Sequence, residues 1–192
     1  MNIVQDVLKS LRLVVVLWVL TAVLYPVITW GFGQVFFANQ ANGSLLVNAQ
    51  GQTIGSSLIG QPFKSDRYFW SRSSTVDYAT QPEIVKTGVS GASNLAPSNP
   101  ELLKRIKTEA QRLQQAQIKP TGDLLYTSGS GLDPHISLES ATAQMARVAK
   151  VRGMNPKELQ IAIERAVDSR SLGIFGEPGV NVLKLNLSLD QK

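Results

Sequence analysis

Residues 13–37 read LVVVLWVLTAVLYPVITWGFGQVFF, and this uncharged run organises the rest of the chain. It contains no Asp, Glu, Lys, Arg or His. It exceeds the roughly 20 apolar residues that a helix needs to cross a bilayer. Because only a helix satisfies all of its own backbone groups in hydrocarbon, the run predicts one membrane-spanning helix. Pro26 lacks an amide hydrogen, so we expect it to kink the helix or to end its regular part.

The charges that flank this run predict its orientation. Lys9 and Arg12 lie just before it, and no basic residue follows it for many positions. Because basic residues concentrate on the cytoplasmic side of a membrane, residues 1–12 are predicted to be cytoplasmic. Residues 13–37 would then span the membrane, and residues 38–192 would form a domain outside the cytoplasm.

A cleaved signal peptide is the alternative interpretation of the same run. Its apolar core would be about 7–15 residues long and would end at small residues in an A-x-A-like pattern. The run here is longer, and the sequence FFANQA at residues 36–41 is a poor cleavage site. The length and the flanks therefore favour an uncleaved anchor.

The composition excludes several classes of protein. Cysteine is absent, so the outer domain rests on its hydrophobic core without disulfides. The net charge of +5 is small and scattered, unlike the basic face of a nucleic-acid-binding protein. One histidine and no cysteine also argue against a zinc site, and we predict no bound metal.

Residues 38–192 alternate between strand and helix patterns, which predicts a mixed α/β fold: a single α+β domain with about three helices against a small sheet. Helices are predicted to begin after the capping residue Asn99, near Ser137 and after Asn155. Gly153 is the predicted end of the second helix. Strand patterns occupy residues 44–54 (a hairpin), 67–72, 124–126 and 183–189, the last with leucine at every second position.

Two further segments have more than one interpretation. The aromatic cluster in residues 67–72 is typical of a core, and a binding wall is the alternative. Residues 73–100 are rich in Ser, Thr, Gly, Asn and Pro, and so long a loop is uncommon in a compact domain. We expect this loop to contact a partner, although its polar side chains could instead satisfy only its own turns.

The glycine-rich loop at residues 128–135 is the strongest candidate for chemistry. A glycine-rich loop before a helix can bind an anion through free N–H groups, but the lysine of a phosphate loop is missing. Ser130, Asp133 and His135 could belong to a hydrolase, yet the G-x-S-x-G elbow is also missing. A structural turn and a ligand or partner contact therefore rank above catalysis, and we predict no catalytic residue.

Several blocks of the sequence resemble one known family, in that family's order and behind one N-terminal membrane helix. They closely resemble the C subunit of the bacterial Kdp-type potassium-transporting ATPase, a P-type pump complex of the cell inner membrane. The match covers nearly the whole chain. The blocks are residues 55–61, 68–72, 90–100, 128–137 and 175–186.

The resemblance implies a non-catalytic accessory subunit of a high-affinity, ATP-driven potassium uptake complex. Its implied partners are the ATPase subunit, the channel-like potassium-binding subunit and a small single-helix subunit. The subunit is needed for assembly, and its family has been assigned the role of a catalytic chaperone that raises the affinity of the ATPase subunit for ATP. The implied nucleotide contacts here are Ser128, Gly129, Ser130, Gly131 and Gln144.

The predicted orientation conflicts with nucleotide binding, because it places these residues outside the cytoplasm, where ATP is scarce. The alternative is a purely structural subunit on the outer face of the complex, near the potassium entrance and without bound nucleotide. In either case the spanning helix is predicted to pack against other membrane helices. Small residues at Ala22, Gly31 and Gly33 would permit a close approach.

Overall fold

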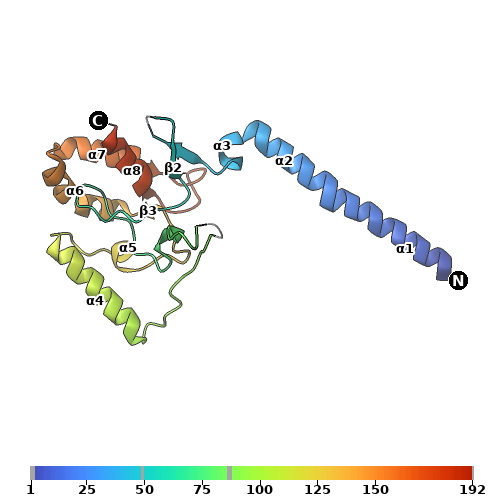
Figure 1. Ribbon diagram of the computed structural model, residues 1–192, viewed down its shortest axis with the longest axis horizontal. Coiled ribbons are helices and arrows are strands. Elements are labelled where there is room, and N and C mark those ends of the chain that lie inside the picture. Colours follow the sequence, from blue (N-terminus) through green and yellow to red (C-terminus); the bar gives the residue numbers. More distant parts are fainter. Residues whose placement is uncertain (1–2, 49, 86–87, 192) are drawn as a thin grey trace. The chain divides into compact units, whose positions relative to one another are not determined.

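The computed structural model describes residues 3–48, 50–85 and 88–191, and the chain forms two compact units. The first unit ends at Leu45 and the second begins at Leu46. Each is described by itself below. Together they form a mixed helix and sheet protein with an apolar N-terminal helix, as the sequence predicts (Figure 1).

The N-terminal unit contains a continuous helical stretch of 34 residues, long and apolar enough to span a membrane. None of its 18-residue apolar window is buried within the structure. The helix begins ten residues before the uncharged run, because the charged segment before Leu13 is also helical. Its parts are α1 (Ile3–Trp18), the π-helical segment η1 (Val19–Leu24) and α2 (Tyr25–Phe36), followed by the short α3 (Ala38–Ala41).

Pro26 interrupts the α-helical pattern without ending the helix. It occupies one of the first two positions of α2, directly after the π-helical segment. The amide of Tyr25 donates to the carbonyl of Leu20, five residues back, which is the π-helical spacing. The wider turn therefore accommodates a residue that cannot donate a hydrogen bond.

The second unit contains two small sheets and several helices (Figure 1). Strands β1 (Leu45–Val47) and β2 (Thr53–Ser56) pair, which confirms the predicted hairpin. The second sheet is antiparallel, with β5 between β3 and β4. The remaining elements are η2 (Asp77–Ala79), α4 (Pro100–Gln115), α5 (Gly122–Leu125), β3 (His135–Ile136), α6 (Leu138–Arg152), α7 (Pro156–Arg165), β4 (Val167–Asp168), β5 (Gly179–Asn181) and α8 (Val182–Asp190).

The three predicted helices are confirmed together with their caps. The side chains of Asn99, Ser137 and Asn155 each accept a hydrogen bond from an amide in the first turn of α4, α6 and α7. Gly153 ends α6 in the left-handed conformation, with a φ of 65°. These bonds satisfy amides that a helix start would otherwise leave unpaired.

The core of the second unit lies where α6, α7 and α8 meet the central strand β5. Val180 in this strand is fully buried and pairs with Ile136 on one side and Val167 on the other. The other fully buried apolar side chains come from several elements and include Phe69, Leu113, Ala141, Val148, Leu159, Ile163 and Leu185.

The predicted strand at residues 67–72 is wrong, although its aromatic cluster is in the core as expected. Side chains, rather than a neighbouring strand, pair with its backbone. The side-chain amide of Asn186 bonds to both N and O of Phe69, at 2.9 and 3.0 Å. Gln144 does the same for Trp70, at 2.7 and 3.1 Å. Phe69 and Trp70 are thus buried without belonging to a sheet.

The predicted strands at residues 124–126 and 183–189 are also wrong. Residues 122–125 form the short helix α5, in which the amide of Tyr126 donates to the carbonyl of Gly122. In α8, Asn181 caps the first turn by accepting from the amide of Lys184 at 3.1 Å. Four of the buried residues in α8 are three or four positions apart, which is the helical spacing, although the leucines alone alternate as in a strand. They are Val182, Leu185, Asn186 and Leu189.

Candidate functional site

The serine-glycine loop, residues 128–132, forms a turn closed by its own side chains. The hydroxyl of Ser128 accepts from the amide of Gly131 at 2.9 Å. The hydroxyl of Ser130 accepts from the amide of Leu132 at 3.1 Å. Serines that bond to amides a few residues ahead commonly replace regular structure in this way. The two serine hydroxyls therefore have a structural use in this conformation.

The long loop, residues 73–100, holds the serine-glycine loop in place. The carbonyl of Ser130 accepts from the amide of Gly91 at 2.7 Å, and the carbonyl of Gly131 accepts from the hydroxyl of Ser74 at 2.6 Å. Gly131 has a φ of +69°, and a Cβ atom there would lie 2.7 Å from a methyl group of Val76. Part of the long loop thus satisfies backbone groups within its own domain.

A left-handed turn in the long loop buries Tyr78. Asp77, Tyr78 and Ala79 have φ values of 46°, 56° and 53°, which non-glycine residues rarely adopt. The Tyr78 hydroxyl donates to the carbonyl of Arg72 at 2.8 Å, and its ring packs against Gly60. Burial raises the pKa of Tyr78 to about 12, so the phenol stays protonated and keeps this bond.

Gln144 lies in the core and not with the serine-glycine loop. Its side chain is fully buried, and its oxygen accepts from Arg147 at 2.9 Å in addition to its two bonds with Trp70. The structure thus brings Ser128, Gly129, Ser130 and Gly131 together and places Gln144 elsewhere.

The arrangement of these five residues does not fit a nucleotide site in this conformation. A phosphate would need free amide donors, whereas those of Gly131 and Leu132 donate to serine hydroxyls. Gln144 would have to leave the core to reach a ligand. Nucleotide contact by these residues therefore stays a prediction that needs a rearranged loop.

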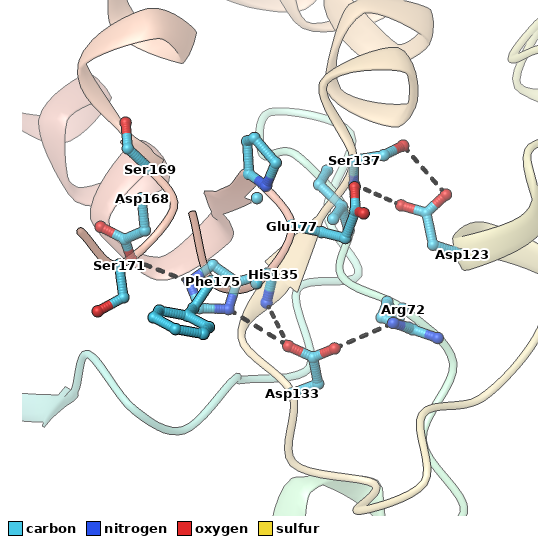
Figure 2. Close-up of a pocket in the computed structure, with 14 residues that line it drawn as sticks. Arg72, Asp123, Asp133, His135, Ser137, Asp168, Ser169, Ser171, Phe175 and Glu177 are labelled. Atoms are coloured by element: carbon cyan, nitrogen blue, oxygen red, sulfur yellow. Dashed lines mark hydrogen bonds and ion pairs between the residues drawn. The ribbon is translucent and has the colours of Figure 1, made fainter. Parts of the chain in front are cut away.

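A chain of side chains with alternating charge forms a second candidate site around β3. Arg72 donates to Asp133 at 3.0 Å, and the Nδ1 atom of His135 lies 3.4 Å from the other oxygen of Asp133. The Nε2 atom of His135 lies 2.9 Å from Asp168. Lys184 of α8 donates to Asp168 at 2.8 Å. The imidazole therefore lies between two carboxylates (Figure 2).

The strand order and one glycine make this arrangement possible. His135 is on β3 and Asp168 is on β4, with β5 between them. The imidazole crosses β5 at Gly179, where a Cβ atom would lie 2.9 Å from the Cβ of His135 and 3.2 Å from its ring. A side chain at position 179 would therefore separate His135 from Asp168.

The carboxylates favour the charged form of His135. Its hydrogen bond to Asp133 is the main cause that raises the pKa of His135, and the bond to Asp168 adds to it against the opposing effect of burial. Burial alone would raise the pKa of Asp133, but its bonds from His135 and the charge of Arg72 lower it. For Asp168, burial is likewise outweighed by His135 and Lys184, and the pKa is lowered.

All of this charge chain except Lys184 lines a pocket of about 600 Å³. Residues of the segment that follows β4 also line this pocket (Figure 2). The lining side chains include four carboxylates, one guanidinium, one imidazole and several serines. They are Arg72, Asp123, Asp133, His135, Ile136, Ser137, Asp168, Ser169, Ser171, Phe175, Glu177 and Pro178.

The hydrolase alternative gains no support from this geometry. Both ring nitrogens of His135 face carboxylates, so neither is paired with the hydroxyl of Ser130. Asp133 and His135 were predicted from the sequence as candidates for chemistry, whereas four residues of this site were not: Arg72, Asp168, Lys184 and Gly179. These residues come from distant segments and match no common motif, so only the fold reveals the cluster.

Comparison with known proteins identifies the family. The sequence model of KdpC, described as the c chain of the K+-transporting ATPase, matches residues 7–191. The Potassium-transporting ATPase KdpC subunit of Synechocystis sp. is 56% identical, over 98% of this chain and 100% of its own. The Potassium-transporting ATPase KdpC subunit of Geobacter sulfurreducens is 41% identical, over 97% of each chain.

The match is of full length and the identity is high, so the chain belongs to the KdpC family of potassium-transporting ATPase subunits. The resemblance noted in the sequence is confirmed. The family makes this chain an accessory subunit of potassium uptake, and an apolar N-terminal helix suits a protein that works at a membrane.

Proposed function

We propose that this chain is a non-catalytic subunit that assembles and stabilises an ATP-driven potassium uptake complex, with its folded domain outside the cytoplasm. The observation that carries the proposal is the family match over residues 7–191. Lys9 and Arg12 before the apolar run support the orientation. The paired nitrogens of His135 support the absence of hydrolytic chemistry at the pocket.

The proposed role of the N-terminal helix is to pack against spanning helices of the other subunits. Small residues let helix backbones approach closely in a membrane, where packing replaces the hydrophobic effect as the driving force. Ala22, Gly31 and Gly33 are the proposed contact positions, and a Cβ atom at Gly31 would meet nothing within 4 Å in the isolated chain. The folded domain would lie against the channel-like subunit near the potassium entrance.

Removing the chain from the complex tests this role. The other subunits are purified with and without it, and potassium-stimulated ATP hydrolysis is measured. We expect hydrolysis to be lost or uncoupled from potassium without the chain, and to return when the full-length chain is added back. ATP hydrolysis by the purified chain alone would contradict the non-catalytic role.

A catalytic chaperone that contacts ATP is the second candidate. The glycine-rich loop before α6 and the family resemblance favour it, whereas the internal bonds of that loop and the predicted orientation oppose it. Binding of labelled ATP to the full-length chain, lost in Ser130→Ala, would support this candidate. No binding at millimolar ATP would remove it and leave the purely structural role.

A further inference from the structure

The segment between β4 and β5 exposes three large apolar side chains at its tip. Leu172, Ile174 and Phe175 are 86%, 72% and 64% exposed. Single exposed apolar residues are common on protein surfaces, but a cluster of large ones marks an interaction site. We call residues 171–176 the apolar hairpin.

The backbone of the apolar hairpin is already folded for contact. Ser171 and Phe175 exchange two hydrogen bonds, of 2.8 and 3.0 Å. The amide of Gly173 donates to the carbonyl of Arg170 at 3.1 Å, and Gly173 has a φ of +74°. Because the turn satisfies these backbone groups itself, little ordering entropy remains to be lost on binding.

The surroundings of the apolar hairpin carry charges of both signs. Phe175 and Glu177 both line the pocket described above (Figure 2). Four carboxylates and two basic side chains line this pocket, Lys184 pairs with the carboxylate of Asp168, and Arg170 directly precedes the hairpin. The side chain of Glu177 is 91% exposed, and its ion pair with Arg170 is long, at 3.8 Å.

This combination of features favours a protein over a lipid surface. A loop that enters a bilayer interface is typically flanked by an excess of Lys and Arg, which attract anionic lipids. This hairpin has one flanking residue of each sign, because Arg170 precedes it and the exposed Glu177 follows it. An apolar centre with a charged rim is the usual anatomy of a protein interface.

We propose that the apolar hairpin docks into an apolar groove of another subunit of the potassium-transporting ATPase, with a basic side chain of that subunit facing Glu177. The inference rests on the proposed function, because it assumes that this chain works inside that complex. To the proposed function it adds which surface of the chain makes the contact and which kinds of side chain make it. It also assigns a docking role to a segment other than the long loop.

Retention of the chain by its complex tests the docking. The full-length chain is co-expressed with the other subunits, one of which carries an affinity tag, and the retained chain is quantified. The triple variant Leu172→Ser, Ile174→Ser, Phe175→Ser is expected to be retained about tenfold less or worse, because central apolar anchors dominate interfaces. Leu103→Ser, at a half-exposed leucine on α4, is the matched control and should be retained normally.

Two further measurements separate a loss of docking from a loss of folding. The melting temperature of the full-length triple variant should match that of the unchanged chain, because the three side chains are exposed. A photoreactive amino acid in place of Ile174 should cross-link to another subunit, and one in place of Leu103 should not. Cross-links only to lipid or to a second copy of this chain would overturn the proposal.

The charge at the rim is tested separately. Glu177→Lys is expected to reduce retention about tenfold, because it sets like charges against each other. Glu164→Lys, an exposed position on α7, should have no effect. Normal retention of both the triple variant and Glu177→Lys would refute the docking inference alone. Failure of the unchanged chain to be retained would instead refute the proposed function.

Discussion

Gln144 and Asn186 each bind the backbone of one residue in the buried segment at Phe69 and Trp70, in the way that a neighbouring strand would. Both amides are buried, so each bond lost leaves a polar group without water. This explains why Phe69 and Trp70 are buried without being part of a strand. An alternating or aromatic pattern cannot reveal it, because the partners lie about 74 and 117 residues away.

Gln144→Leu should therefore destabilise the full-length chain by about 2–5 kcal/mol, since two buried backbone groups of Trp70 lose their partners. Gln114→Leu, at an exposed position on α4, is the control and should change stability by less than about 0.5 kcal/mol. Chemical denaturation in detergent measures both. Full stability of Gln144→Leu together with weaker ATP binding would instead favour the nucleotide contact implied by the family.

His135 should make stability depend on pH. Its pKa in the folded state is raised, mainly by Asp133, above the ordinary value of 6.5. Its stabilising contribution is therefore complete below that value and is lost as the pH rises through the higher folded pKa. Asp133 and Asp168 have lowered pKa values and stay ionised over the same range, so they do not reverse this trend.

The prediction is that the unchanged chain loses stability relative to His135→Gln, which cannot titrate, as the pH rises above the ordinary imidazole value of 6.5. Melting temperatures of the two full-length proteins across this range provide the measurement. Parallel pH profiles would show that the carboxylates do not hold the imidazole in its charged form.

At the scale of elements, hydrogen bonds join the long loop to the serine-glycine loop, and two glycines of the serine-glycine loop differ sharply in the space around them. Gly131 has a positive φ and no room for a Cβ atom, whereas a Cβ atom at Gly129 would meet nothing within 4 Å. Two substitutions in the same turn can therefore separate steric effects from functional ones.

Gly131→Ala should destabilise the domain by about 1–3 kcal/mol, through the clash with Val76 and the left-handed backbone. Gly129→Ala should be close to neutral. Thermal unfolding of the two full-length variants compares them directly. Equal stability of the two variants would mean that the long loop does not pack against the serine-glycine loop in solution.

Local signals predicted the helices better than the strands. Asn99, Ser137 and Asn155 identify helix starts because capping is decided within a few residues. The leucines of residues 183–189 favoured a strand because alternation hides spacings of three and four. The three-stranded sheet has strands of two or three residues, too short for any pattern to reveal.

At the scale of the whole molecule, the sequence predicted the family and the apolar N-terminal helix, and it pointed to one edge of the pocket through Asp133 and His135. The rest of the site depends on tertiary structure. Asp168 meets His135 only because β5 lies between their strands and carries Gly179 at the crossing. The apolar hairpin was missed because its side chains stand out only once their exposure is known.

The central claim is that the folded domain acts from outside the cytoplasm, and side-specific labelling tests it most directly. The chain has no cysteine, so Gly129→Cys introduces a single thiol at an open, exposed position. Gln5→Cys, before the apolar run, is the control for the opposite side. We predict that a membrane-impermeant maleimide labels Gly129→Cys in intact spheroplasts and labels Gln5→Cys only after lysis. Labelling of Gly129→Cys only after lysis would contradict the account and bring the serine-glycine loop within reach of cellular ATP.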